Sequence, residues 1–227
     1  MSKIVVLSSG GLDSTVLLYK AVKEHGKANV MAINMFYRQR HDKELECFKW
    51  QMEHLGIENY QQFDLSTIFT NDNNCKLFKW NGDVPQGTYA EQKPEGGTVE
   101  TYVPFRNGLF LAVAASIAEQ LGYDEVWCGV HRDDVAGEAY PDCSAQFIND
   151  MGNAIRQGTA AHIRVAAPWV NFTKAEVVGT GVKLGMTEEE FSHTWSCYEG
   201  GDKPCGTCAT CIDRAKAFEA NGLRGDL

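Results

Sequence analysis

The sequence feature that most constrains the fold is a run near the N-terminus, from Lys3 to Tyr19, that reads K-I-V-V-L-S-S-G-G-L-D-S-T-V-L-L-Y. Its apolar, β-branched start predicts a buried strand, and the apolar stretch from Thr15 predicts a helix that ends near Glu24. Gly10 and Gly11 lie between them, where the lack of a Cβ allows a sharp turn and a close approach to a ligand. Because free N–H groups and the helix dipole favour negative charge at a helix N-terminus, this run predicts a phosphate site.

The side chains of this turn suit a nucleotide. Ser9, Ser14 and Thr15 can donate hydrogen bonds to phosphate oxygens, whereas Asp13 would repel them, so we expect Asp13 to act through Mg²⁺ or to hold the loop. The run matches neither the Walker A pattern nor the Rossmann fingerprint. Instead, S-G-G-x-D-S after a first strand resembles the PP-loop of ATP pyrophosphatases, which implies ATP cleavage between the α and β phosphates; the alternative is an ordinary Gly-Gly turn. The resemblance places ATP at Ser8, Ser9, Gly10, Gly11, Leu12, Asp13, Ser14, Thr15, Val16, Leu17 and Leu18.

Beyond this run, predicted strands and helices alternate along the chain. We expect further strands at 30–36, 60–65, 124–130 and 163–167. We expect further helices at 43–55, 108–121 and 174–184, the last one capped by Asn171 or Thr173, and one from the capping residue Ser144 to about Gln157. This order predicts an α/β fold with a doubly wound, parallel, five-stranded sheet.

Residues 66–101 interrupt the alternation. The segment is polar and rich in turn residues at 71–74 and 91–97, and Leu77, Phe78 and Trp80 suggest at most a partial helix. A long irregular segment within a compact domain is often functional, so we expect a mobile loop over the site. The predicted organisation is therefore a PP-loop α/β domain at 1–190 and a C-terminal zinc-binding helical segment at 191–227.

The C-terminal segment is defined by its cysteines. Four of the eight cysteines, Cys197, Cys205, Cys208 and Cys211, follow the spacing C-x7-C-x2-C-x2-C, and a helix is expected at 212–220. Four thiolates suit tetrahedral Zn²⁺, and a closed set of four protein ligands leaves no open position, so we expect a structural zinc. A redox pair or an iron–sulfur cluster remains the alternative, because C-x2-C-x2-C runs also bind such clusters.

Composition narrows the range of partners. The 227 residues are 44% hydrophobic and 22% charged, with no apolar run of membrane-spanning length and no export signal, so we expect a cytoplasmic protein without membrane contact. The formal net charge of −9 favours a small-molecule substrate over stable nucleic-acid binding.

Several motifs together point to one family. The motifs S-G-G-L-D-S, Y-R-Q-R-H, Y-V-P-F-R-N and Y-P-D-C and the cysteine spacing, in this order, resemble the 7-cyano-7-deazaguanine synthases of the queuosine pathway. The resemblance implies an ATP-dependent carbon–nitrogen ligase that converts 7-carboxy-7-deazaguanine and ammonia to 7-cyano-7-deazaguanine. It further implies an adenylated carboxylate, an amide intermediate, one structural zinc and a homodimer.

Candidate site residues follow from these motifs. The predicted catalytic residues are Asp13, Ser14, Arg40, His41, Arg106 and Lys174. The predicted substrate-binding residues are Tyr37, Arg40, Arg106, Asn107, Tyr140, Asp142 and Cys143. Arginine forks match carboxylate and phosphate oxygens, and His41 could serve as a base toward ammonium or the amide, or merely start a helix. For Cys143 we favour packing in the pocket over nucleophilic chemistry.

The chain also departs from the family pattern. Arg38 and Phe105 stand where the family usually has glycine, and the segment 131–139 differs before Y-P-D-C. These changes leave open an amide-forming enzyme that stops at 7-amido-7-deazaguanine or passes the acyl group to another amine. A PP-loop enzyme that modifies tRNA and a nucleotide-sensing or zinc-dependent interaction module without turnover are the remaining alternatives.

Overall fold

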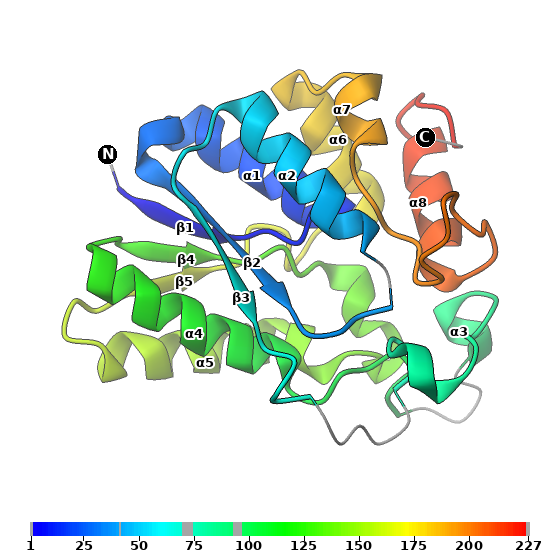
Figure 1. The fold of residues 1–227 in the computed structure, drawn as a ribbon, viewed down its shortest axis with the longest axis horizontal. Coiled ribbons are helices and arrows are strands. Elements are labelled where there is room, and N and C mark those ends of the chain that lie inside the picture. The colour runs from blue at the N-terminus through cyan, green and yellow to red at the C-terminus, as the bar shows by residue number, and fades with distance from the viewer. Residues whose placement is uncertain (1, 41, 70–74, 93–96, 226–227) are drawn as a thin grey trace.

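A computed structural model describes the chain except for residues 1, 41, 70–74, 93–96 and 226–227 (Figure 1). Its centre is a parallel five-stranded sheet in the order β3-β2-β1-β4-β5. The strands are β1 (Ile4–Leu7), β2 (Val30–Phe36), β3 (Tyr60–Asp64), β4 (Glu125–Trp127) and β5 (Arg164–Ala166). The order reverses between β1 and β4, so the predicted doubly wound α/β fold is confirmed.

Helices cover both faces of the sheet (Figure 1). One face carries α1 (Leu12–His25), α2 (Lys43–Leu55), α6 (Lys174–Leu184) and α7 (Glu188–Ser192). The other face carries α4 (Arg106–Leu121) and α5 (Ala145–Gly158). The short α3 (Tyr89–Gln92) and the C-terminal α8 (Ala209–Glu219) lie beyond the carboxyl ends of the strands, and α8 also packs on α6. Short 3₁₀ turns occupy Lys27–Asn29, Lys79–Asn81, Arg132–Glu138 and Pro141–Cys143.

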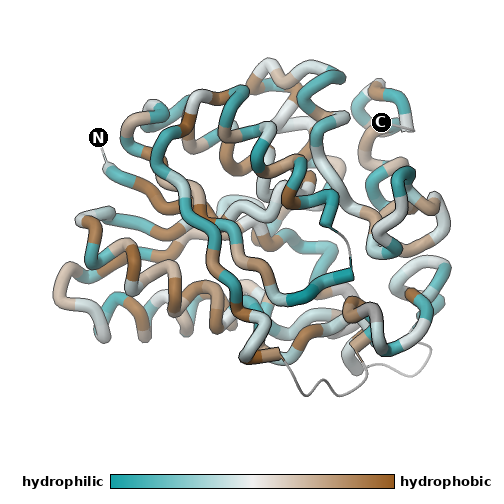
Figure 2. The backbone as a smooth tube through the Cα atoms, in the orientation of Figure 1, coloured by the Kyte–Doolittle hydropathy of each residue, from teal (hydrophilic) through white to brown (hydrophobic). Residues whose placement is uncertain are grey.

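The core forms on both faces of the sheet because the central strands are apolar throughout. Ile4 and Val6 of β1 pack with α1, whereas Val5 between them packs with α4 on the opposite face. All three side chains are fully buried, as expected for a parallel strand covered on both sides. Figure 2 shows hydrophobic stretches along these strands and along the helix sides that face them.

Three predicted elements, at 30–36, 43–55 and 174–184, have the predicted bounds. Others differ near the site. The first helix begins at Leu12 instead of Thr15, α4 begins at Arg106 instead of 108, and α8 begins at Ala209 instead of 212. Strand β4 ends at Trp127 instead of 130, because the chain then leaves the sheet and Gly129 passes against the backbone of Ser14. Sequence analysis did not predict α3 or α7, which are four and five residues long.

The described parts of the segment 66–101 are packed against the domain. Leu77 and Phe78 are buried in a cluster with Tyr37, and Trp80 lies in the 3₁₀ turn Lys79–Asn81. The polar run at 71–74 lies outside the described residues, and the mobility of the loop stays a prediction. Among the described helices, none has the length and apolar character needed to cross a membrane.

Candidate active site

A cavity of about 240 Å³ lies at the carboxyl ends of the central strands. Its wall includes Leu7 at the end of β1, Met35 of β2, and Gly129 and Val130 just after β4. This is the point at which the strand order reverses, where open α/β sheets bind their ligands. Residues from α4, α6 and α8 complete the wall.

The PP-loop forms one side of the cavity and is held by hydrogen bonds within itself. The Ser9 hydroxyl accepts from the Gly11 N–H (3.0 Å), and the Ser14 hydroxyl donates to the Gly11 carbonyl (3.1 Å). Gly10 has φ +93°, and a Cβ there would collide with the Glu44 carbonyl at the start of α2. Glycine is therefore required at this position, and it brings α2 directly onto the loop. The first turn of α1 faces the cavity, as predicted for an anion site.

A cluster of charges lies beside the loop. The Asp13 Oδ2 atom lies 3.3 Å from Lys174 Nζ and 3.6 Å from His131 Nε2, and His131 Nε2 lies 3.4 Å from Asp134 Oδ1. Lys174 is the first residue of α6, where Thr173 and Glu176 form a capping box. Its N–H donates to the Asp133 carboxylate (2.8 Å), so this loop after β4 also fixes the start of α6.

The proximity of these groups changes their pKa values. Partial burial raises the pKa of Asp13, but the charges of Lys174 and His131 outweigh it and hold this pKa well below its usual range. Burial lowers the pKa of His131, but Asp134 and Asp13 outweigh it and raise the pKa above 6.5. Burial likewise lowers the pKa of Lys174, whereas Asp13, Asp134 and Asp213 raise it above its ordinary value. Asp13 and Lys174 are thus ionised near neutral pH, and the nearby carboxylates favour the protonated form of His131.

Arg106 forms a second cationic part of the cavity. Its guanidinium lies 5.5 Å from the ring centre of Tyr37 and 5.9 Å from that of Phe110, and it donates to the Tyr37 hydroxyl (3.0 Å). Burial lowers the pKa of Arg106, but Tyr37 and Asp142 raise it above its ordinary value, so the side chain stays charged. Two aromatic faces hold this cation while it lines the cavity.

The Y-P-D-C motif supports the start of α4. The Asp142 carboxylate accepts from the Asn107 N–H (2.9 Å), and the Asn107 amide donates to the Asp142 carbonyl (3.3 Å) and to Cys143 Sγ (3.1 Å). Asn107 and Cys143 line the cavity, whereas Asp142 does not. Burial raises the pKa of Cys143 well above its ordinary value, so the thiol is protonated. This agrees with packing rather than nucleophilic chemistry for Cys143.

Most predicted site residues meet at this cavity. Those that line it are Ser8, Ser9, Gly11, Leu12, Asp13, Ser14, Tyr37, Arg106, Asn107, Tyr140, Cys143 and Lys174. Val16, Leu17 and Leu18 instead lie in the hydrophobic core, and the Thr15 hydroxyl donates to the Gly11 carbonyl (2.7 Å). The predicted ATP-binding range is therefore corrected: the second turn of α1 supports the loop from behind.

The placement of Arg40 differs from its predicted catalytic and substrate-binding role. Arg40 does not line the cavity; its guanidinium contacts the Glu199 carboxylate (3.4 Å) and donates to the Gly82 carbonyl. His41 lies outside the described residues, so its role as a base stays a prediction. Arg40 turns toward Gly82 and toward Glu199, which lies between Cys197 and Cys205, rather than toward the PP-loop.

Sequence reasoning missed several residues that line the cavity. These are Gln39, Glu44, Tyr89, His131, Asp134, Trp195, Ser196, Tyr198, Thr210 and Asp213. The polar run 131–134 after a predicted strand carried a signal for His131 and Asp134, because such runs lie at the carboxyl edge of the sheet. Tyr198 is adjacent to Cys197, but no local pattern indicates that this segment reaches the cavity.

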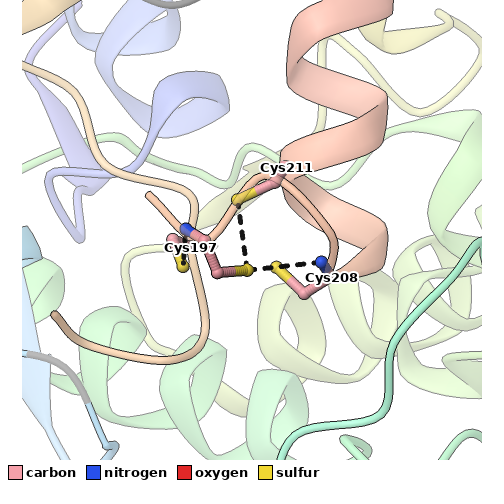
Figure 3. A group of neighbouring side chains, drawn as sticks. Cys197, Cys208 and Cys211 are labelled. Atoms are coloured by element: carbon pink, nitrogen blue, oxygen red, sulfur yellow. Dashed lines mark hydrogen bonds between the residues drawn. The ribbon is translucent and has the colours of Figure 1, made fainter. Parts of the chain in front are cut away.

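The four predicted metal ligands come together next to Ser196 and Tyr198 of the cavity wall. Figure 3 labels three of them, Cys197, Cys208 and Cys211. The sulfur atoms of Cys197, Cys205, Cys208 and Cys211 all lie within 4.8 Å of one another. Backbone N–H groups of Glu199 and Cys205 point at Cys197 Sγ (3.4 and 3.3 Å), and the Cys208 N–H points at Cys205 Sγ (3.3 Å). Because such donors stabilise thiolates and four sulfurs suit tetrahedral Zn²⁺, this donor set fits a zinc ion.

Comparison with known proteins agrees with this geometry. A family described as "Queuosine biosynthesis protein QueC" matches residues 3–222. A protein of a Nitratiruptor species, named 7-cyano-7-deazaguanine synthase, is 39% identical over 228 residues, which cover 99% of this chain and 97% of that protein. Proteins with the same name from Archaeoglobus fulgidus and Caldicellulosiruptor bescii are each 37% identical and cover 99% of this chain and 89% and 96% of their own lengths.

None of these three relatives is named as an amide-forming or a tRNA-modifying enzyme, so those alternatives gain no support. The match spans the PP-loop, the charge cluster beside it and the four cysteines together. The chain belongs to the QueC family of queuosine biosynthesis proteins.

Proposed function

We propose that this protein is a 7-cyano-7-deazaguanine synthase. It joins ammonia to 7-carboxy-7-deazaguanine at the expense of ATP, first forming the amide and then the nitrile. Its family membership supports this activity. The structural observation that carries the proposal is that a PP-loop, the Asp13–Lys174–His131 cluster and Arg106 line a single cavity.

The chemistry requires an oxygen of the acid to become a good leaving group. The carboxylate oxygen attacks the α-phosphorus of ATP, the bond to the β-phosphate breaks and pyrophosphate departs. Ammonia then attacks the carbonyl carbon and AMP departs, which gives the amide. A second adenylation, now on the amide oxygen, lets that oxygen leave with AMP as the nitrogen loses its protons to form the nitrile.

The PP-loop side of the cavity suits the triphosphate. The first turn of α1 and the hydroxyls of Ser9 and Ser14 would bind phosphate oxygens, and Lys174 would offset the charge that develops as pyrophosphate leaves. Asp13 holds Lys174 and His131 in place through its Oδ2 atom. The buried Oδ1 atom of Asp13 has no hydrogen-bond partner in the described part of the chain, which suits a bond to Mg²⁺.

Arg106 suits the acid. It is charged, lies over the rings of Tyr37 and Phe110, and lines the same cavity as the PP-loop. A guanidinium in this position would bind the carboxylate and orient it toward the α-phosphate, and such positioning is a large part of catalysis by adenylating enzymes. Asn107 and Tyr140 would contact the deazapurine ring.

The remaining features of the proposal follow from the family and the chemistry. We propose a structural zinc at the four cysteines, where it would hold the C-terminal segment, and Mg²⁺ with ATP. We also propose a homodimer that works in the cytoplasm, where thiol ligands stay reduced, with small-molecule substrates and no stable nucleic-acid partner.

Product analysis tests the proposal. The purified protein is incubated with 7-carboxy-7-deazaguanine, ammonium and Mg-ATP, and bases and nucleotides are read by mass spectrometry. We expect the nitrile together with AMP and pyrophosphate. Amide with AMP and no nitrile would contradict the second step, and a failure to form AMP with this acid would contradict the activity altogether.

A further inference from the structure

Three tyrosine hydroxyls converge on the wall of the cavity. The Tyr198 hydroxyl lies 3.1 Å from that of Tyr89 and 3.3 Å from that of Tyr140, and the last two lie 3.5 Å apart. The Thr101 hydroxyl lies 2.7 Å from the Tyr140 hydroxyl. All three tyrosines line the cavity, and each comes from a different part of the chain: α3, the first position of Y-P-D-C, and the residue after Cys197.

The backbone around the cysteines positions two of these tyrosines. Tyr198 follows the ligand Cys197 directly in the sequence. Tyr89 follows a segment that pairs with the cysteine loop, where Gln86 bridges to Cys208 and the Gly87 N–H donates to the Thr207 carbonyl (2.9 Å). Val84 of the same segment is buried among the cysteines.

The hydroxyl cluster is chemically suited to a heteroaromatic ring rather than to an anion. A phenol hydroxyl is neutral near pH 7, so the three tyrosines offer an anion no positive charge. Each hydroxyl carries one proton and two lone pairs. When the three hydroxyls donate their protons to one another, lone pairs remain that can accept hydrogen bonds from a ligand. A guanine-like edge presents ring N–H and amino donors, which such acceptors match.

We propose that the Tyr89–Tyr140–Tyr198 cluster is the subsite that recognises the donor edge of the deazapurine, and that the cysteine cluster assembles this subsite when it binds its metal. The inference rests on the proposed function and assigns its ring-binding site. Tyr198 is the positioning residue that links the two clusters. Metal binding and acid binding are therefore thermodynamically coupled, and the coupling acts in both directions.

The first test compares Tyr198→Phe with the wild type. The substitution keeps the ring and all four cysteines and removes only the hydroxyl. By calorimetry we expect the Kd of the acid to rise roughly tenfold, the upper range for one hydrogen bond, and the Kd of an ATP analogue to change less than about twofold. Tyr123→Phe, on the loop between α4 and β4 and away from the cavity, is the matched control and leaves both constants unchanged.

The second test reads the metal directly. Zinc-loaded protein is mixed with a chromogenic chelator, and the rate of zinc transfer is measured with and without saturating acid. If the subsite and the metal are coupled, bound acid slows zinc loss by about threefold or more in the wild type and in Tyr123→Phe. In Tyr198→Phe, measured at saturating acid, this protection is lost or strongly reduced.

The outcomes separate this inference from the proposed function. The assigned subsite would be overturned if the wild-type protein forms the nitrile and Tyr198→Phe binds the acid as tightly as the wild type does. Unchanged zinc loss with the acid bound would overturn the coupling. Wild-type protein that neither binds nor converts the acid would overturn the proposed function, and the inference with it.

Discussion

Asp13 is a carboxylate placed where phosphate is expected, and its neighbours explain how the site tolerates it. Lys174 and His131 contact the same Oδ2 atom from two other segments of the chain. The Lys174 cation therefore offsets the charge of Asp13 before any substrate binds, and both basic side chains are held at fixed positions. Preorganised charge of this kind stabilises a transition state without the cost of rearrangement.

Lys174→Met should remove much of this preorganisation. We expect AMP formation to fall by roughly a hundredfold or more, because a cation at the departing pyrophosphate is lost. The free energy of unfolding should fall by roughly 3 kcal/mol, because Asp13 keeps its charge with one cation fewer. Steady-state AMP release and urea unfolding measure the two effects. Lys183→Met, at the other end of α6, is the control. An equal loss of AMP formation and of stability in the two variants would contradict the role of Lys174.

The pH dependence of stability reports on His131. Asp134 and Asp13 raise its folded-state pKa above 6.5 despite burial and the opposing charge of Lys174. The protonated imidazole therefore stabilises the folded chain fully below about pH 6.5, and this contribution is lost as the pH rises through the raised pKa.

His131→Gln should remove that contribution. We expect the stability difference between the wild type and this variant to be largest at about pH 5.5–6 and to shrink steadily toward pH 9. Urea unfolding at a series of pH values measures it. His25→Gln, whose ring packs on Trp127 at the far end of α1, controls for the loss of an imidazole. A difference that grows with pH would contradict the assigned charge state.

At the scale of elements, the start of α4 has a left-handed residue that is not glycine. Phe105 precedes the helix with φ 54°, and its ring lies over Gly108, where a Cβ would collide with the ring. The same backbone conformation occurs at Arg38, with φ 67°. These are the two positions where the family resemblance leads one to expect glycine, so the loops keep a glycine-like backbone with a bulky side chain in place. This explains how the sequence departs from the pattern without moving Tyr37 or Arg106 out of the cavity.

A double-mutant cycle tests this arrangement. Gly108→Ala alone should lower the free energy of unfolding by about 1–3 kcal/mol, because the new methyl group meets the Phe105 ring. In a Phe105→Gly background the same change should be neutral or stabilising by up to about 1 kcal/mol, since alanine favours a helix over glycine. Thermal and urea unfolding of the four proteins give the coupling. Equal effects in both backgrounds would contradict the contact between the ring and Gly108.

At the scale of the whole molecule, the C-terminal segment is part of the site rather than an appendage. The Trp195 N–H donates to the Gly10 carbonyl (3.1 Å), and its indole N–H donates to the Cys197 carbonyl (2.8 Å). The residues 195–198 thus contact the PP-loop, include the predicted metal ligand Cys197 and end in the cavity at Tyr198. Arg214 of α8 donates to the Ser196 hydroxyl of this segment (3.3 Å) and to the Thr194 hydroxyl just before it (2.7 Å).

Cys208→Ser should therefore affect more than the metal. We expect loss of zinc, a lower melting temperature and faster amide exchange both at 194–198 and at the PP-loop, because structural zinc supplies several kcal/mol of folding free energy. Metal analysis, thermal unfolding and hydrogen exchange measure these effects. Cys47→Ser, a half-buried cysteine outside the four ligands, is the control. A stable, metal-free and fully active Cys208→Ser protein would show that the cluster has no structural role.

Features that depend on short stretches of chain could be predicted from the order of the residues alone. Hydrophobic periodicity predicted all five strands and the six longer helices, glycines predicted the turn before α1, and cysteine spacing predicted the four sulfurs that the structure brings within 4.8 Å. These signals are readable because neighbouring residues specify them. The ends of strands and the starts of helices at the site were less well predicted. Residues there line the cavity, so they do not show the regular hydrophobic periodicity of a strand or a helix.

Contacts between residues that are distant in the sequence arise from the packing of the folded chain. Reversal of the strand order between β1 and β4 places His131 beside Asp13, and the capped start of α6 adds Lys174. The same packing turns Arg40 toward Glu199 and brings Tyr198 from the metal segment to the cavity. These ion pairs join residues that are more than 100 positions apart in the sequence. Such pairs, and the lining of the cavity, depend on distances in the folded chain, which no local sequence pattern encodes.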